Sequence, residues 1–316
     1  MDFSSRCFTV LAWMAAGAAA IRLLARRVRP TPSVRGASVA IVGASSGIGC
    51  CLALEYARRG ARLVLCARRE ELLHEVAAAC RQHSPNVQVV VGDITHRETQ
   101  LALRDVAAAA FDGRIDYLVL NAGVISVRPV TELWPLQHPA AADDEEVRGA
   151  ADRAEALLLQ TLGVNAVAPA TVAGLFLPLL ITSQGVVVVV SSVAGLVAAP
   201  TRALYSASKH ALTGYFSAFR MEVARLGVAV TMVYPGTVDT DLRRSAVDSV
   251  DSTLPAAGSS RGKLSPHTCA CQVIRAAALR QSSLVTPWSY WLVTAVLHPI
   301  VPSLVEYLAK KKYGLV

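Results

Sequence analysis

Short apolar runs and longer amphipathic stretches alternate along the middle of the chain. The short runs have the length and valine-rich composition of buried strands, and the longer stretches place apolar residues at helical spacing. Strands are expected at 38–42, 62–66, 87–91, 117–120, 186–190 and 229–234, and helices at 49–59, 70–82, 97–110, 156–180 and 205–226. This alternation predicts an α/β fold: a single Rossmann-type, doubly wound parallel sheet with helices on both faces.

A glycine-rich turn joins the first expected strand to the first expected helix. Its glycines are Gly43, Gly47 and Gly49. In this position a turn lets the backbone approach a pyrophosphate, and the following helix offers unpaired N–H groups and a positive dipole end. The turn therefore predicts a dinucleotide site at the carboxyl edge of the sheet.

A tyrosine and a lysine form the most informative chemical pair in the chain. Tyr205 and Lys209 are spaced to share one face of a helix, where the ammonium can lower the proton affinity of the phenol and suit it to acid–base catalysis. An exposed helix pair without chemistry is the alternative. Ser192 follows the valine run at 186–190, so it is expected at the strand edge where parallel sheets bind ligands. This juxtaposition favours an enzyme.

These motifs resemble those of the short-chain dehydrogenases/reductases over the range 35–280. The matching residues are Gly43, Gly47 and Gly49 at the spacing Gly-x-x-x-Gly-x-Gly, Asn121-Ala122-Gly123 after the fourth strand, the four residues Asn165, Ser192, Tyr205 and Lys209, and Pro235-Gly236 after the sixth strand. Ala67-Arg68-Arg69 and the segments around Ser192 and Tyr205 are most similar to membrane-anchored hydroxysteroid dehydrogenases of the corticosteroid 11-beta type.

The resemblance implies an enzyme that interconverts a carbonyl and a secondary alcohol. Tyr205 would exchange a proton with the substrate oxygen, and Ser192 would stabilise the charge developing on it. Lys209 would hold the nicotinamide ribose and lower the pKa of the tyrosine, while Asn165 would orient a water that relays protons. The alternative is a catalytically silent, membrane-bound NADP(H)-binding scaffold, which needs the glycine turn but not these four residues.

NADP(H) is the expected cofactor because Arg68 and Arg69 follow the second strand, where NAD enzymes usually present an acidic residue. Guanidinium groups stabilise a 2′-phosphate, which an acid would repel. Ordinary surface charges are the alternative interpretation. The resemblance adds further expected contacts: Gly43, Ser45, Ser46, Gly47, Ile48 and Gly49 at the pyrophosphate, Asp93 and Ile94 at the adenine, Asn121, Ala122 and Gly123 near the adenosine ribose, Tyr205 and Lys209 at the nicotinamide ribose, and Pro235, Gly236, Val238 and Thr240 in the nicotinamide pocket.

Composition narrows the remaining possibilities. With 316 residues, 53 % of them hydrophobic, the chain can bury one large core. The formal charge is +8, but six arginines and one aspartate among the first 40 residues account for +5 of it, so no nucleic-acid partner is expected. The seven cysteines and seven histidines are dispersed, and no metal is expected; Cys269 and Cys271 could bind one only with distant partners.

The N-terminal segment 1–34 is predicted to be a hydrophobic anchor with a basic flank. Residues 7–21 are uncharged and mostly apolar, and snorkelling by Arg22 would extend them toward the roughly 20 residues that a bilayer span requires. A cleaved signal peptide is the alternative, because Ala18-Ala19-Ala20 could supply a cleavage site. We expect an intracellular membrane such as the endoplasmic reticulum, and the arginines after the run predict a cytosolic catalytic domain.

Three further segments have less regular patterns. The tail at 281–316, which follows the expected dehydrogenase domain at 35–280, is apolar with a basic end. It is expected to lie in the membrane interface, with Lys310-Lys311-Lys312 at anionic head groups, to roof the substrate cavity, or to pack on the fold or complete a dimer. The acidic insertion at 139–152 predicts a solvated loop or an extra polar helical turn, with a flap or a subunit contact as alternatives. The segment 245–265 predicts a mobile loop over the substrate.

The expected partners follow from the anchor and the resemblance. A membrane anchor beside an apolar tail favours a lipophilic substrate, such as a steroid, a retinoid, a keto-sphingoid base, acyl-dihydroxyacetone phosphate or another lipid carbonyl. The resemblance also implies a homodimer, formed through the helices at 156–180 and 205–226.

Overall fold

The computed structural model describes residues 30–134, 143–242, 246–248 and 263–316. The chain divides into two units, Met1–Ser33 and Val34–Val316, and the fold described below belongs to the second. The anchor expected at 7–21 lies outside the described residues.

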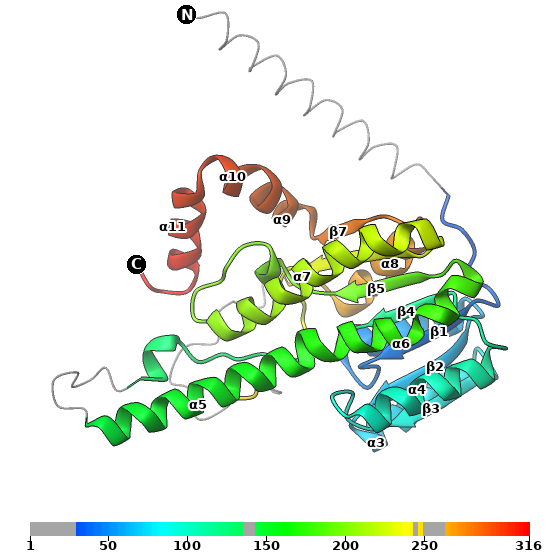
Figure 1. Ribbon diagram of the computed structural model, residues 1–316. Helices are drawn as coiled ribbons and strands as arrows, with labels where there is room; N and C mark the ends of the chain where they lie inside the picture. Colours follow the sequence, from blue (N-terminus) through cyan, green and yellow to red (C-terminus); the bar gives the residue numbers. More distant parts are fainter. Residues whose placement is uncertain (1–29, 135–142, 243–245, 249–262) are drawn as a thin grey trace, which may run out of the picture. The chain divides into compact units, whose positions relative to one another are not determined.

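Seven parallel strands form one sheet in the order β3-β2-β1-β4-β5-β6-β7 (Figure 1). The strands are β1 (Ser38–Val42), β2 (Arg62–Ala67), β3 (Val87–Val91), β4 (Tyr117–Leu120), β5 (Val186–Val190), β6 (Ala229–Pro235) and β7 (Ser283–Thr286). This is the predicted Rossmann order with one strand added, and its direction reverses between β1 and β4. Ligands of such sheets bind at this reversal, outside the carboxyl ends of the strands.

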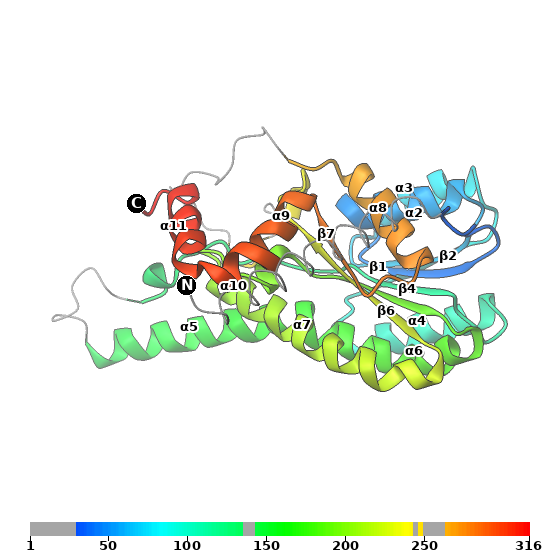
Figure 2. The ribbon, with the colours of Figure 1, turned by 90° about the horizontal axis from the view of Figure 1, so that it is seen from above.

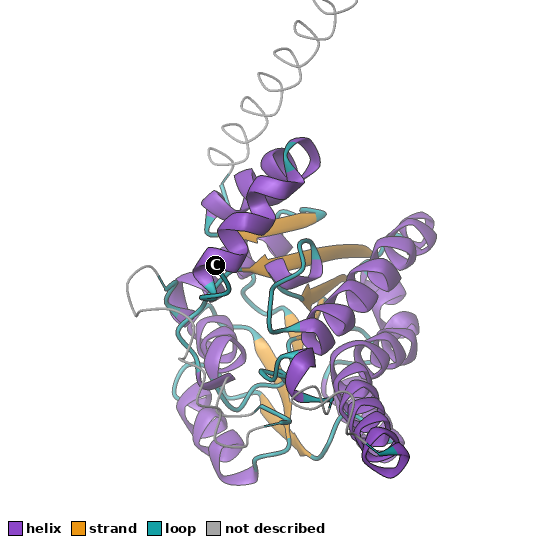
Figure 3. Cartoon of the chain, turned by 90° about the vertical axis from the view of Figure 1, so that its left-hand side faces the viewer, coloured by secondary structure: helices purple, strands orange, loops and turns teal. Residues whose placement is uncertain are grey.

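Helices cover both faces of the sheet (Figure 2, Figure 3). Helices α2, α3 and α8 pack on one face, and α4, α6 and α7 pack on the other. Their bounds are α2 (Gly47–Arg58), α3 (Glu70–Arg81), α4 (Arg97–Ala110), α5 (Asp144–Leu162), α6 (Ala168–Ser183), α7 (Ala203–Val223) and α8 (Pro266–Ala278). The predicted fold class is therefore confirmed for the sheet and its two helical layers.

Strand β5 shows why a run of valines suits the centre of this sheet. All five of its residues are buried. Successive side chains point to opposite faces, so Val187 and Val189 join the core with α4, α6 and α7, whereas Val186 and Val188 join the core with α2, α3 and α8. Because both faces of the strand are covered by helices, every position is apolar.

The acidic insertion forms part of a long helix. Asp143 caps α5, since its carboxylate accepts a hydrogen bond of 2.7 Å from the N–H of Glu146, and three acidic residues occupy the first turn. Helix α5 continues for 19 residues. The helical alternative therefore holds for residues 143–152, in a longer form than a single extra turn; residues 139–142 lie outside the described part of the chain.

Within the described residues, the helical run Asp144–Ser183 is long and apolar enough to cross a bilayer by length and composition. Its most apolar part is α6, where Val172, Phe176 and Leu180 are fully buried in the core against the sheet. Packing against the sheet accounts for these apolar positions, while 39 % of the most apolar stretch of the run is buried inside the fold.

The sheet and the tail extend further than the patterns predicted. Strand β7 pairs with β6 and lies beyond the expected boundary at 280, so the sheet continues into the tail. After β7 the chain forms α9 (Trp288–Leu292), the π-helical η6 (Val293–Leu297), α10 (His298–Ile300) and α11 (Pro302–Lys312). Figure 1 shows these elements in red, with α11 turning back toward α7.

Candidate active site

One cavity of about 580 Å³ lies at the carboxyl edge of the sheet, where the order of the strands reverses. It is large enough for a sizeable organic ligand. The expected site residues that line it are Gly43, Ser45, Ser46, Gly47, Ile48, Arg68, Arg69, Asp93, Ile94, Asn121, Ala122, Gly123, Ser192, Tyr205, Lys209, Pro235, Gly236, Val238 and Thr240. Two expected residues, Gly49 and Asn165, lie behind this wall.

The glycine turn after β1 is set by close backbone contacts. Gly43 has a φ of +81°, and a Cβ there would lie 2.7 Å from the backbone of Ala122. A Cβ on Gly49 would lie 2.0 Å from the carbonyl oxygen of Gly43. That same oxygen accepts a hydrogen bond of 2.9 Å from the Asn121 side chain. Gly49 therefore supports the turn from behind, and Asn121 ties it to the end of β4.

Two arginines after β2 extend along the wall of the cavity beside the glycine turn. The Arg69 guanidinium donates hydrogen bonds to the hydroxyls of Ser45, at 3.1 Å, and Ser46. Arg68 forms an ion pair of 3.3 Å with Asp93. Burial alone would raise the pKa of Asp93, but hydrogen bonds from Thr95 and the Arg68 charge hold it below its ordinary value. The result is a set of cationic and hydroxyl donors suited to a phosphate.

The phenol, the hydroxyl and the ammonium expected to do the chemistry are brought together by two elements. Helix α7 carries Tyr205 and Lys209, and the 3-10 turn η3 (Val193–Gly195) follows Ser192. Ser192 and Tyr205 are joined by a side-chain hydrogen bond. Lys209 is buried, and its Nζ donates a hydrogen bond of 3.2 Å to the carbonyl oxygen of Val190.

Burial dominates the ionisation of this group. It raises the pKa of Tyr205 to about 12, against a smaller lowering by the hydrogen bond with Ser192. It lowers the pKa of Lys209 to about 8. The expectation that Lys209 lowers the pKa of the tyrosine is therefore not met in the structure, because removal from water disfavours the charged form of both groups. The lysine Nζ lies 5.8 Å from the centroid of the Tyr205 ring.

Asn165 acts on the backbone beside the site. It lies in a π-helical segment, η2 (Gly163–Val167), between α5 and α6. Its carboxamide donates to the carbonyl oxygen of Val124 at 2.9 Å and accepts from the N–H of Val124 at 2.8 Å. It also donates to Ser208 at 2.9 Å. The side chain thus links the segment after β4 to α7 and has no face on the cavity.

The loops after β4 and β6 are tied together by one buried carboxylate. Asp248 accepts hydrogen bonds from the Ser126 hydroxyl, at 2.7 Å, and from the N–H groups of Val127 and Arg128, each at 2.9 Å. The Val127 carbonyl accepts from Arg202, the residue that precedes α7, at 2.6 Å. Asp248 belongs to the loop expected over the substrate; most of that loop, residues 249–262, lies outside the described part of the chain.

The sequence patterns allowed the tail to roof the cavity but did not identify the tail residues that line it. Eight tail residues line it: Tyr290, Val293, Leu297, Val305, Leu308, Ala309, Lys312 and Tyr313. Arg202 lies under the Tyr313 ring, with 5.8 Å between the guanidinium carbon and the ring centroid. The tail therefore roofs the cavity, as one of the three alternatives held. No periodic signal singled out these residues, because they come from short helices interrupted by proline.

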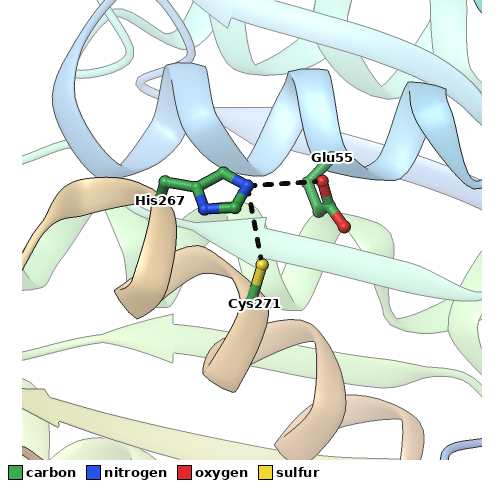
Figure 4. Close-up of side chains that lie close together, drawn as sticks. All are labelled: Glu55, His267 and Cys271. Atoms are coloured by element: carbon green, nitrogen blue, oxygen red, sulfur yellow. Dashed lines mark hydrogen bonds and ion pairs between the residues drawn. The ribbon is translucent and has the colours of Figure 1, made fainter.

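A second cluster of ionisable side chains lies away from the cavity (Figure 4). The ligand atoms of Glu55, His267 and Cys271 lie within 4.8 Å of one another. His267 Nε2 is 3.7 Å from Glu55 Oε2 and 3.8 Å from Cys271 Sγ. Glu55 is already held by the Arg59 guanidinium at 2.7 Å, with Arg58 at 3.7 Å. Two cations beside the only carboxylate oppose a metal ion, so the cluster serves as a polar contact between α2 and α8.

Comparison with known proteins agrees with this geometry. The family profile described as short chain dehydrogenase matches residues 37–251. The chain belongs to the short chain dehydrogenase family. It is 32 % identical over 286 residues to 11-beta-hydroxysteroid dehydrogenase A of Sesamum indicum, an alignment that covers 89 % of this chain and 76 % of that protein. It is 31 % identical over 288 residues to hydroxysteroid 11-beta-dehydrogenase 1-like protein B of Xenopus laevis, covering 90 % and 89 % of the two chains.

Solved short chain dehydrogenases share the fold. A Burkholderia cenocepacia J2315 short chain dehydrogenase in complex with NADP matches with a TM-score of 0.65 and 24 % identity, over 88 % of this chain and 99 % of that one. A Burkholderia phymatum short chain dehydrogenase/reductase in complex with NAD matches with a TM-score of 0.69 and 23 % identity, over 86 % and 96 %. The chain is therefore an oxidoreductase of this family and is similar to hydroxysteroid dehydrogenases.

Proposed function

We propose that this protein is an NADP(H)-dependent oxidoreductase that interconverts a carbonyl and a secondary alcohol on a lipophilic substrate, with Tyr205 as general acid and base. One observation carries the proposal: the hydrogen-bonded Tyr205 and Ser192, with Lys209 beside them, line the same cavity as the glycine turn. A scaffold that only bound a nucleotide would not need these groups in register at the sheet edge.

The proton chemistry is assigned to three residues. The nicotinamide of a bound cofactor supplies hydride for reduction and takes it up in oxidation. Tyr205 donates its hydroxyl proton to the carbonyl oxygen, and Ser192 donates a hydrogen bond that stabilises the developing charge. Lys209, whose pKa burial lowers to about 8, is still mostly protonated at neutral pH and can return a proton to the phenolate. Asn165 positions the backbone of Val124 and holds α7 through Ser208.

The donor set fits NADP(H) better than NAD(H). Arg69, Ser45 and Ser46 form one hydrogen-bonded group beside the glycine turn, and no acidic residue ends β2. Arg68 and Arg69 would hold the 2′-phosphate as two guanidinium partners. The expected adenine, ribose and nicotinamide contacts belong to the same proposal.

A lipophilic substrate is supported by the wall that the tail provides. The cavity has an apolar wall of tail residues, made by Val293, Leu297, Val305 and Leu308. The similarity to proteins named 11-beta-hydroxysteroid dehydrogenase suggests steroids first, with retinoids, keto-sphingoid bases and other lipid carbonyls as further members of the class.

Membrane association through the N-terminal segment and the tail is part of the proposal. The outer surface of the tail exposes large apolar side chains: Trp288, Leu292, Ile300, Val301, Leu304, Tyr307, Leu315 and Val316. Aromatic and aliphatic residues next to Lys310 and Lys311 suit the interface of an anionic bilayer. With the N-terminal anchor, this surface would place the cavity mouth at an intracellular membrane such as the endoplasmic reticulum, with the catalytic domain in the cytosol.

A homodimer is proposed through α5, α6 and α7. These helices expose Leu159, Tyr215 and Met221, the last with 71 % of its surface accessible, and η2 between α5 and α6 exposes Val167. Apolar side chains exposed on adjacent helices suit a self-complementary contact.

The test is turnover by the purified protein with NADPH and a panel of steroid, retinoid and long-chain ketones. We expect NADPH oxidation with at least one lipid ketone, and its loss in Tyr205→Phe by about 1,000-fold or more with NADPH affinity nearly unchanged. Tight NADPH binding without turnover of any ketone would favour the silent scaffold. Turnover that survives Tyr205→Phe would refute the assigned acid.

A further inference from the structure

A second pair of a phenol and an ammonium lies in the cavity, far along the chain from the first. Tyr290 comes from α9, and Lys312 is the last residue of α11. The lysine Nζ donates a hydrogen bond of 3.2 Å to the Tyr290 hydroxyl and lies 5.7 Å from the centroid of its ring. Both residues line the cavity that contains Tyr205. The tail therefore brings a cation to the substrate side of the site.

The position of Tyr290 is fixed at the end of β6. A Cβ on Gly236 would lie 2.4 Å from the Tyr290 ring, so the ring packs directly on the glycine backbone. The Tyr290 hydroxyl also forms hydrogen bonds with Thr237. Burial alone would raise the pKa of Tyr290, but the Lys312 charge and these hydrogen bonds hold it below its ordinary value. Tyr290, held by these hydrogen bonds, thus helps to set where Lys312 lies.

Lys312 differs in its partners from two other cations of the cavity. Arg68 is paired with Asp93, and Lys263 with Asp239, each at 3.3 Å. Arg69 and Lys209 instead donate to hydroxyls of the glycine turn and to the Val190 carbonyl oxygen. Among the described residues, no carboxylate lies within ion-pair distance of Lys312, and it donates its hydrogen bond to a neutral phenol. Lys310 and Lys311 precede it on the same helix and do not line the cavity. Lys312 therefore presents positive charge to the cavity mouth without an internal counter-ion.

The surroundings of Lys312 define what it could bind. The apolar side chains of Val293, Leu297, Val305 and Leu308 line the same part of the cavity. We propose that Lys312, positioned by Tyr290, binds an anionic group of the substrate, so that the preferred substrates are amphiphiles with an apolar body and a carboxylate or phosphate. This inference rests on the proposed function, which it narrows from lipid carbonyls in general to acidic ones.

The experiment compares charged and neutral forms of one substrate. A long-chain keto fatty acid and its methyl ester test a carboxylate, and an acyl-dihydroxyacetone phosphate and its dephosphorylated alcohol test a phosphate. Assays in neutral detergent micelles exclude effects of anionic lipid. We expect the wild type to prefer the charged member of at least one pair. Lys312→Met should raise the KM for that member by about tenfold and change the KM of the neutral member and both kcat values less than about twofold, as a single mouth-exposed charge contact predicts.

Two kinds of variant make the result specific. Lys311→Met and Lys310→Met remove the same charge from the same helix and should leave the charged-to-neutral preference unchanged. Lys312→Arg should retain it, and Tyr290→Phe should lower it by about threefold, because the lysine loses its hydrogen-bond support. A structural role of Lys312 alone would alter both members of a pair equally.

Three results would overturn the proposal. They are a wild type that shows no preference for either charged member, equal losses for charged and neutral substrates in Lys312→Met, and a loss of NADPH affinity in that variant, which would assign the cation to the cofactor. Turnover of neutral substrates that is lost in Tyr205→Phe supports the proposed function whatever Lys312 does. If no ketone is turned over, equilibrium binding of the keto acid and its ester to wild type and Lys312→Met still decides this inference.

Discussion

The two ends of the cavity are built in different ways. At the glycine-turn end, close contacts are between backbone atoms: a side chain on Gly49 would meet the Gly43 carbonyl oxygen at 2.0 Å. At the tail end, a side chain on Gly236 would meet the ring of Tyr290, which is itself a side chain, at 2.4 Å. The Gly43 backbone is tied to β2 and β4 by hydrogen bonds and has little room to move, whereas a ring on a short helix can move aside. The difference predicts a site that is invariant where it holds the nucleotide and adaptable where it holds the substrate.

The largest expected effect tests the rigid end. Gly49→Ala should lower NADPH affinity by about 100-fold or more, equal to about 3 kcal/mol, because the methyl group would push the turn away from the strand. Isothermal titration calorimetry with NADPH measures the loss. Gly174→Ala is the matched control, since a Cβ on this α6 glycine meets nothing within 4 Å. It should leave affinity unchanged. Similar affinities in the two variants would show that the turn is not rigid.

The next effect tests the residue between the two ends. Burial lowers the pKa of Lys209 from 10.5 to about 8, so between these values the unfolded chain holds a proton that the folded protein has lost. The free energy of unfolding should therefore rise with pH across this window, by about 3 kcal/mol in total for this group. The free energy of unfolding of the wild type should therefore rise with pH relative to that of Lys209→Met, as measured by urea unfolding of both proteins at pH 7.5, 9 and 10; the buried cysteines with raised pKa values affect both proteins alike. If the free energy of unfolding changes with pH equally in the two proteins, burial does not disfavour the charged form of Lys209.

A smaller effect concerns the choice of cofactor. Arg69→Ala removes the guanidinium that joins Ser45 and Ser46, and should reduce the preference for NADPH over NADH by roughly 10- to 100-fold. The ratio of the kcat/KM values for the two cofactors measures it. Arg81→Ala is a suitable control, because Arg81 donates to the Val87 carbonyl and does not line the cavity. An unchanged ratio in Arg69→Ala would mean that the arginine is a surface charge.

The smallest effect tests the adaptable end. Gly236→Ala should raise the KM for ketone substrates by less than about tenfold, because the Tyr290 ring can shift to admit the methyl group. Combining it with Tyr290→Ala should remove any clash, so the double variant should be no worse than Tyr290→Ala alone. If the increases in KM caused by Gly236→Ala and Tyr290→Ala are additive in the double variant, the Tyr290 ring is not the reason that position 236 requires glycine.

Sequence predicted the rigid end well and the adaptable end poorly, for a physical reason. Gly43 and Ser192 each closely follow a buried strand, Tyr205 lies near the start of the helix that connects β5 to β6, and parallel strands bring their carboxyl ends together. Lys312 and Tyr290 come from short helices after the sheet, and neither a strand period nor a helix period relates them. Their meeting depends on the route of the chain through β7, a strand that the apolar pattern did not resolve from the tail.

Ionisation was the other property that residue spacing could not supply. The spacing of Tyr205 and Lys209 correctly predicts that they share one helix, but it does not predict how deeply the fold buries them. Desolvation reverses the expected direction of the tyrosine pKa. The helical start at 143–146 was simpler to predict from sequence. Acidic residues favour the N-cap and first turn of a helix, and this preference does not depend on tertiary packing.

The hydrogen bonds of the buried Asp248 carboxylate affect how this enzyme could acquire new substrates. Its carboxylate accepts hydrogen bonds from the hydroxyl of Ser126 and from the backbone N–H groups of Val127 and Arg128. Two loops that are 120 residues apart in the sequence are therefore held together by one side chain. A change that loosens one stretch necessarily loosens the other. New substrate preferences are therefore expected to arise through paired substitutions in the loops after β4 and β6. They can also arise through substitutions in the tail, which lines the same cavity without a hydrogen bond to Asp248.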